Sequence, residues 1–253
     1  MASRIPIAFD VLGTCFSHDP AKEALVSVFK TVSDAQAESV IQDWFHSAQR
    51  DFTYLSMNGS YMPIGQVLKN TLPRILLMHS LVPASSASPS TTLSTFDSSL
   101  TDPIISTLSA MRPRPSLAAC SDVLLSHNFR LMAATNGALG TTRGLFERGL
   151  GKEVAERWEY FSTDEAKVAK PDQSVYQNIW KKLGVEEGGE KKGWFIAAHT
   201  WDLFPAKKAG FKTAFVTYEE HLVLPDLFGE PDIVAKDLED AAKQIIERED
   251  GQA

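Results

Sequence analysis

From about residue 115 to the C-terminus, short apolar segments alternate with stretches of helical periodicity. Short apolar strands separated by helices are typical of a parallel sheet with right-handed crossovers. The pattern therefore predicts an α/β fold with a doubly wound, Rossmann-like parallel sheet. The expected strands lie at Ile5–Phe9, Phe129–Ala134, Tyr160–Phe161, Trp194–Ala198, Phe211–Thr217 and Asp232–Val234.

Residues 20–80 have a different pattern, with apolar residues at helical spacing and no comparable strand. The simplest interpretation is an all-helical cap, inserted directly after the first strand. We therefore expect a core built from residues 1–18 and 110–253 and a cap spanning residues 19–109. A Ser/Thr-rich stretch at 84–99 has no apolar period and is expected to be an exposed loop of the cap.

Composition excludes several classes of function. The chain of 253 residues is 43% hydrophobic, enough to bury a full core, and its net charge of −7 comes without a basic stripe that would bind nucleic acid. No apolar stretch approaches the roughly 20 residues that cross a bilayer. The two cysteines, Cys15 and Cys120, are far apart in the sequence, which favours a reducing, cytoplasmic compartment.

A single carboxylate, Asp10, follows the first apolar segment, and Gly13 and Thr14 come directly after it. Open α/β sheets place their chemistry at the carboxyl ends of their strands. Glycine permits a sharp turn there, and the Thr14 hydroxyl can orient the loop. An aspartate at a strand end is also common as a simple turn residue, so this segment alone does not decide between the two interpretations.

Three later segments deliver polar groups to the same predicted edge. Thr135-Asn136-Gly137 offers a hydroxyl, an amide and backbone N–H groups, which suit an anion or an oxyanion. Lys170, predicted to open a helix with Pro171 in its first turn, could pair with Asp10 and keep it ionised. His199 and Asp202 follow a buried strand, where an imidazole and a carboxylate could activate a water molecule.

The order of these segments resembles the haloacid dehalogenase (HAD) superfamily, and its 2-haloacid dehalogenase (type II) branch in particular. The resemblance covers nearly the whole chain, including the helical cap after the first motif. The segments that carry it are Asp10-x-x-Gly13-Thr14, Thr135-Asn136-Gly137, Lys170-Pro171-Asp172-x-x-x-Tyr176 and Trp201-Asp202.

The resemblance implies a role for each motif. Asp10 would be the nucleophile that attacks carbon and forms an ester with the protein. Thr14 and Thr135 would hold its carboxylate, and Lys170 would neutralise it. Asp202 would position or deprotonate the water that cleaves the ester, with help from His199.

Two further matches concern the surroundings of the reaction. Asn136 corresponds to a residue that positions the substrate or the leaving group. Tyr176 corresponds to a tyrosine near the active-site carboxylates.

Leu12 argues against a phosphatase. Phosphatases of this superfamily carry a second aspartate two residues after the nucleophile, as general acid for the leaving alcohol. Without that acid, phosphoryl transfer would lose roughly 10²–10⁴-fold in rate. Asp10 and Asp202 alone would also be a poor octahedral set for Mg²⁺. We therefore expect neither a metal nor another cofactor.

The chain also departs from the dehalogenase branch. Leu12 stands where that branch has a tyrosine, and His46 stands where a cap arginine receives the substrate carboxylate or the halide. A neutral imidazole binds an anion more weakly than a guanidinium does. His199 replaces an amide with a titratable base, which could strengthen water activation, although a loop histidine bonded to a backbone carbonyl is the alternative.

The sequence thus predicts a metal-independent hydrolase that acts on a small organic acid, a haloacid by family default. Two main alternatives remain. One is a lyase or hydratase that uses Asp10, Lys170 and His199 for proton transfer, and the other is a non-catalytic binding module. A metal-dependent phosphatase is the weakest of the alternatives. The expected partner is a small-molecule substrate, and the resemblance also implies a homodimer.

Overall fold

The computed structural model describes residues 4–83, 92–184 and 193–251. The chain divides into two compact units. One, here called the core unit, comprises Met1–Ser17 and Pro113–Ala253, and the other, the helical unit, comprises His18–Arg112. The bounds expected from the sequence were residues 1–18 with 110–253 for the first and 19–109 for the second.

The core unit contains a six-stranded sheet with the order β5-β4-β1-β6-β7-β8, and every strand pair is parallel. This confirms the predicted α/β class and its doubly wound sheet. Buried parallel strands are apolar on both faces, which explains their near-continuous hydrophobic runs. The strands are β1 (Ile5–Phe9), β4 (Phe129–Thr135), β5 (Glu159–Ser162), β6 (Trp194–Ala197), β7 (Lys212–Val216) and β8 (Ile233–Ala235).

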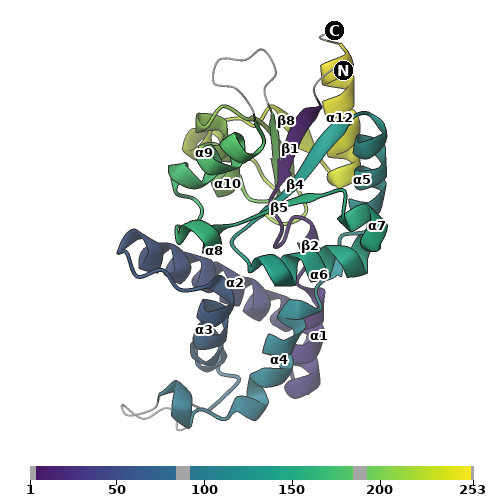
Figure 1. The fold of residues 1–253 in the computed structure, drawn as a ribbon. Helices are drawn as coiled ribbons and strands as arrows, with labels where there is room; N and C mark the ends of the chain where they lie inside the picture. Colours follow the sequence, from purple (N-terminus) through teal and green to yellow (C-terminus); the bar gives the residue numbers. More distant parts are fainter. Residues whose placement is uncertain (1–3, 84–91, 185–192, 252–253) are drawn as a thin grey trace. The chain divides into compact units, whose positions relative to one another are not determined.

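Helices cover both faces of this sheet (Figure 1). One face is covered by α5 (Leu117–Ser126) and α12 (Leu238–Asp250), and the other by α9 (Gln173–Lys182) and α10 (Thr200–Lys208). The remaining elements of the unit are β2 (Phe16–Ser17), α6 (Leu139–Leu150), α7 (Lys152–Ala155), α8 (Thr163–Ala166) and α11 (Pro225–Phe228), and β2 pairs with β3 (Arg112–Pro113).

The start of α9 differs from the prediction. Lys170 and Pro171 precede the helix, which begins at Gln173. Asp172 is its N-cap, because the Asp172 carboxylate accepts a hydrogen bond from the backbone N–H of Ser174 at 2.8 Å. The expectation that Pro171 lies in the first turn of this helix was therefore wrong, and Lys170 lies in the loop before it.

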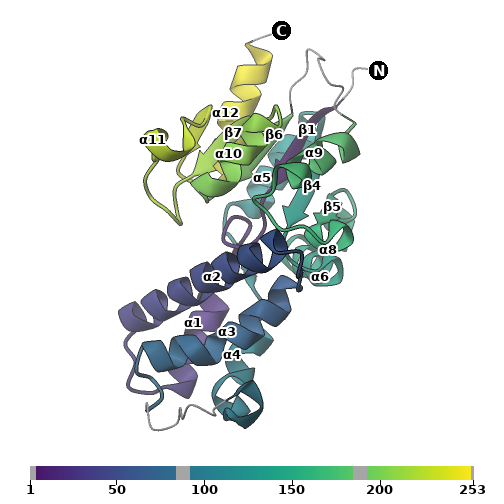
Figure 2. The same cartoon turned by 90° about the vertical axis from the view of Figure 1, so that its left-hand side faces the viewer.

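The helical unit contains no sheet of its own among the described residues. Its two long helices, α2 (Asp34–Met57) and α3 (Ile64–Met78), lie side by side (Figure 2). The buried indole of Trp44 on α2 joins them by donating to the carbonyl of Leu68 at 2.9 Å. The shorter helices are α1 (Asp19–Val28), η2 (Leu93–Thr95), η3 (Ser98–Leu100), α4 (Asp102–Ser106) and η4 (Thr107–Ser109).

The predicted loop at 84–99 is only partly described. Residues 84–91 lie outside the described residues, and the remainder holds η2 and the start of η3. Within the described ranges, no helix combines the length and apolar character needed to span a membrane.

Candidate active site

Three central strands end at the same edge of the sheet, and each is followed by a predicted site residue. Phe9 of β1 is in register with Ala133 of β4 and with Ile196 of β6. Asp10 follows directly, and its backbone N–H donates to the carbonyl of Ile196 at 2.9 Å. The parallel register therefore brings the residues after these strands together, as the sequence predicted.

The Asp10 carboxylate is almost fully buried and held on both oxygens. Thr14 Oγ1 donates to Asp10 Oδ2 at 2.7 Å, and Lys170 Nζ donates to Asp10 Oδ1 at 3.0 Å. Burial alone would raise the pKa of Asp10, but the Lys170 ammonium, the His199 imidazole and the Thr14 hydroxyl hold it well below the ordinary carboxyl range. The carboxylate is therefore ionised throughout the neutral pH range.

Lys170 lies between two carboxylates. Its Nζ donates to Asp202 Oδ2 at 2.9 Å as well as to Asp10. Only 1% of the Lys170 side chain and none of the Asp202 side chain is exposed. Burial would lower the pKa of Lys170, but the two carboxylates raise it above its ordinary value. One buried ammonium thus serves two buried carboxylates.

The second oxygen of Asp202 is also engaged, because the Tyr176 hydroxyl donates to Asp202 Oδ1. Burial raises the pKa of Asp202, although the Lys170 ammonium opposes that shift. Burial and the neighbouring Asp202 charge raise the pKa of Tyr176 well above its ordinary value, so the phenol keeps its proton. Both predicted residues therefore lie in the same buried network as Asp10.

His199 lies on the other side of Asp10, at the N-cap of α10. Its Nδ1 is 3.5 Å from Asp10 Oδ2 and has no hydrogen-bond partner in the described part of the chain. Burial would lower the pKa of His199, but the Asp10 carboxylate, with Glu220 and Asp202, raises it above 6.5. For the alternative prediction, a loop histidine that donates to a backbone carbonyl, the described residues provide no such acceptor at Nδ1.

Gly13 makes room for that imidazole. Its φ is +81°, and a Cβ atom at this position would lie 2.8 Å from His199 Cε1. Any side chain would therefore meet both backbone strain and the histidine ring. The glycine of the first motif is required by the close approach of His199 as well as by the turn.

The Thr135-Asn136-Gly137 turn differs in detail from the expectation. Thr135 Oγ1 accepts from the backbone N–H of Gly137 at 2.8 Å, a bond within its own turn. Asn136 Oδ1 accepts from the backbone N–H of Lys170 at 3.0 Å. Thr14 thus holds the Asp10 carboxylate, while Asn136 fixes the backbone that carries the lysine.

The geometry of this network does not test two other predicted residues, Leu12 and His46. Leu12 is partly buried in the loop after β1, where its backbone bridges to Phe16. His46 lies on α2 of the helical unit with an exposed side chain. Their roles toward a substrate stay predictions.

Four residues that contact the site from outside were not predicted: Arg114, Tyr218, Glu219 and Glu220. Arg114 donates to the carbonyl of Gly13, and Tyr218 donates to the carbonyl of Thr14. Glu220 accepts from the first residue of α10. Tyr218, Glu219 and Glu220 come shortly after the end of β7, as Asp10 comes after the end of β1. A search for polar residues after strand ends could therefore have found them. Arg114 lies outside any such pattern.

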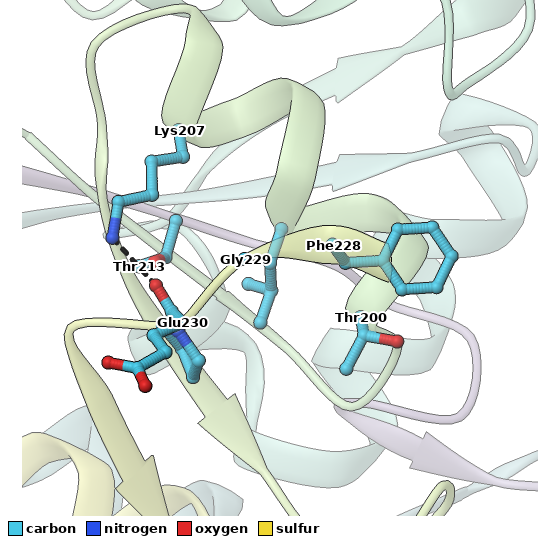
Figure 3. A pocket seen from close by; sticks show the side chains of 8 residues that line it. Thr200, Lys207, Thr213, Phe228, Gly229 and Glu230 are labelled. Carbon is cyan, nitrogen blue, oxygen red and sulfur yellow. Dashed lines mark hydrogen bonds between the residues drawn. The ribbon is translucent and has the colours of Figure 1, made fainter. Parts of the chain in front are cut away.

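A small pocket beside α10 includes Thr200 in its lining but none of the residues that hold the Asp10 carboxylate (Figure 3). Its lining has no histidine, cysteine or aspartate, and its Lys207 donates to the Glu230 carbonyl at 2.7 Å. The lining residues are Thr200, Leu203, Lys207, Thr213, Phe228, Gly229, Glu230 and Pro231.

Comparison with solved structures identifies the fold. One L-2-haloacid dehalogenase superposes with a TM-score of 0.79 at 16% identity, over 97% of this chain and 100% of that one. The L-2-haloacid dehalogenase from Xanthobacter autotrophicus gives 0.74 at 20% identity, over 96% and 98% of the two chains. The protein YfnB from Bacillus subtilis, in a magnesium-bound structure, gives 0.66 at 14% identity, over 96% and 99%.

The predicted resemblance to haloacid dehalogenases is thereby confirmed at the level of the fold. No protein-family model matches the chain, and no curated protein matches it either. At identities of 14–20%, the superpositions establish the architecture and leave the reaction to be argued from the site.

One of these structures binds magnesium, so the fit of this site to that ion bears on the reaction. Magnesium takes near-octahedral oxygen ligands. Here the four oxygens of Asp10 and Asp202 accept from Lys170, Thr14 and Tyr176, and the ammonium occupies the place between the carboxylates. Across the described ranges, no group of three or more His, Cys, Asp and Glu side chains could hold a metal. The residues present therefore do not form a magnesium site.

Proposed function

We propose that the protein is a hydrolase that displaces a leaving group from the carbon of a small organic acid, through an ester on Asp10. The observation that carries the proposal is the state of Asp10: a buried, ionised carboxylate held by Lys170 and Thr14. A binding module has no need of such a nucleophile, and a structural ion pair has no need of a second carboxylate on the same lysine.

In the first half-reaction, an Asp10 oxygen attacks the substrate carbon. The C–O bond of the ester forms as the bond from that carbon to the leaving group breaks, and the leaving group departs with the electron pair. Lys170 and Thr14 keep the carboxylate ionised and oriented until it reacts. No proton donor is needed when the leaving group is a halide, which agrees with Leu12 in place of an acid.

In the second half-reaction, water attacks the ester carbonyl carbon of Asp10. Lys170 Nζ and Thr14 Oγ1 each lie on one carboxylate oxygen, so the donor at the oxygen that stays unesterified would stabilise the negative charge of the tetrahedral intermediate. Collapse of that intermediate restores the Asp10 carboxylate and releases a hydroxy acid, whose departing oxygen takes up the proton that the base removed from the water. The water oxygen then remains in the aspartate side chain.

The water needs a base, and His199 is better suited to that task than Asp202. Both Asp202 oxygens already accept hydrogen bonds, from Lys170 and Tyr176, and the side chain is fully buried. His199 Nδ1 has no hydrogen-bond partner within the described ranges and lies 3.5 Å from Asp10 Oδ2. We therefore assign proton removal to His199, and the placement of Lys170 to Asp202.

Short 2-halo acids are the proposed substrates. The L-2-haloacid dehalogenases that share the fold support this class, and so does the absence of an acid at position 12. We propose that His46 contributes to binding the substrate anion.

Halide release from a panel of short 2-halo acids in EDTA tests the proposal. Wild type and Asp226→Asn, a matched change at an exposed aspartate, should release halide, and Asp10→Asn should not. A single turnover in H₂¹⁸O should place ¹⁸O in Asp10. Release without this label would favour direct water attack or lyase chemistry and overturn the covalent step, and no release by wild type would overturn the halogenated substrate.

A further inference from the structure

We infer that the turn after β7, Thr217–Glu220, acts with Arg114 to set the spacing between the nucleophile Asp10 and the base His199. This inference rests on the proposed function for the roles of those two residues. The turn is here called the positioning turn. Its residues contact both segments that meet at the site: the loop that carries Asp10 and the helix start that carries His199.

On the nucleophile side, three successive carbonyls are held from outside the loop. The Gly13 carbonyl accepts from Arg114 Nε at 3.1 Å and Nη2 at 3.0 Å. The Thr14 carbonyl accepts from the Tyr218 hydroxyl, and the Cys15 carbonyl accepts from the backbone N–H of Arg114 at 2.8 Å. Two residues thereby fix the path of the loop immediately after Asp10.

Arg114 is itself held by the positioning turn. Its guanidinium forms an ion pair with Glu219 and lies 4.4 Å from the centroid of the Tyr218 ring. The side chains of Arg114 and Glu219 are only 18% and 16% exposed, so solvent weakens the pair less than it would at the surface. Arg114 and Tyr218 therefore act as one unit on the loop.

On the base side, Glu220 holds the first residue of α10. Its Oε2 accepts from the backbone N–H of Thr200 at 2.8 Å and from Thr200 Oγ1 at 2.7 Å. His199 directly precedes Thr200, and a carboxylate at this helix start also interacts favourably with the helix dipole. Glu220 thereby anchors the backbone of the proposed base.

The contacts that hold the loop after Asp10 and those that hold the start of α10 are linked through Thr14. Its hydroxyl donates to Asp10 Oδ2 at 2.7 Å and accepts from the backbone N–H of Ala198 at 2.9 Å. Moving either the loop or the helix start would therefore change the 3.5 Å separation of Asp10 and His199. Because Glu219 and Glu220 are adjacent, one short turn governs both sides of that separation.

Three variants test this inference. Glu220→Ala and Tyr218→Phe each remove one anchor, whereas Glu220→Gln keeps an acceptor for Thr200 without the charge. A misplacement of about 1 Å can cost about 100-fold in rate, so Glu220→Ala and Tyr218→Phe should lower kcat by about 10- to 100-fold with little change in KM. Glu220→Gln should recover most of kcat, and Glu230→Gln, at an exposed glutamate, should match wild type.

Two readouts do not depend on turnover and so separate this inference from the proposed function. NMR titration of the His199 imidazole should give a lower pKa in Glu220→Gln than in wild type, because Glu220 contributes to raising it. Hydrogen exchange of the Ala198 amide should be faster in Tyr218→Phe, at unchanged melting temperature. If wild type shows no turnover, these two measurements alone test whether the positioning turn holds the loop and the helix start.

Unchanged kcat in Glu220→Ala and Tyr218→Phe, in an active wild type, would overturn the inference. So would an unchanged His199 titration together with unchanged Ala198 exchange. A loss of kcat that Glu220→Gln does not recover, accompanied by a matching drop in melting temperature, would also overturn it by indicating a merely structural role.

Discussion

Replacing Lys170 with methionine should destabilise the core unit strongly. Among the interactions described, the ammonium is the cation that donates to both Asp10 and Asp202, and all three side chains are at most 9% exposed. Removing one partner of a buried pair leaves an uncompensated charge and costs about 3–5 kcal/mol. Here one substitution removes the ammonium from two buried carboxylates. We therefore expect the free energy of unfolding to fall by an amount at the upper end of that range near pH 7.

The loss should depend on pH in a defined direction. In wild type the pKa of Asp10 is depressed, so its contribution to stability is present above the ordinary carboxyl pKa of 3.8 and is lost as pH falls through the folded value. In Lys170→Met, burial without the ammonium raises the pKa of both carboxyls, which take up protons more readily when folded. The difference in unfolding free energy should therefore shrink between pH 7 and pH 4.

Urea unfolding followed by circular dichroism, at several pH values, measures this difference. Lys152→Met is a matched control, because its side chain is 79% exposed and 3.8 Å from Glu156. That change should stay within about 0.5 kcal/mol. The double variant Lys170→Met/Asp202→Asn should recover part of the loss. A loss for Lys170→Met below about 1 kcal/mol, or one that does not vary with pH, would refute the reasoning.

Three further predictions concern single side chains. With His199 as the base, the rate of ester hydrolysis should rise with pH through the pKa of His199 in the esterified enzyme, which lies below its pKa in the free enzyme because the Asp10 charge is gone; His199→Asn should remove this limb, and a limb that persists in the variant assigns the base elsewhere. Gly13→Ala should lower halide release by at least about 10-fold, because the new Cβ would displace the imidazole; wild-type release would contradict this. Ser33→Ala removes the N-cap bond to the Gln36 N–H of α2 and should cost about 1 kcal/mol in urea unfolding, with activity per folded molecule unchanged.

The sequence predicted the parts of the site that depend on strand order. Apolar strands in a parallel sheet leave little freedom of register, so the residues that follow β1 and β6 had to meet. Asp10 and His199 do so, and Lys170 reaches Asp10 from the loop before α9.

The details that escaped prediction depend on single hydrogen bonds. The Thr135 hydroxyl could serve Asp10 or its own turn with equal ease, and only the backbone geometry decides. Arg114 and Tyr218 donate hydrogen bonds to backbone carbonyls. Because every residue has a backbone carbonyl, the sequence pattern does not predict these contacts. The role of His46 toward a substrate, the homodimer and the cytoplasmic location stay predictions.

The short distance between Asp10 and His199 also has a consequence for the timing of catalysis. In the free enzyme the negative carboxylate favours a protonated imidazole, suited to receiving an anionic substrate. Once Asp10 is esterified under the proposed reaction, that negative charge is gone, and burial drives the proton off His199. The charge of Asp10 therefore controls the protonation of His199. The imidazole can accept a proton from water only after the ester has formed.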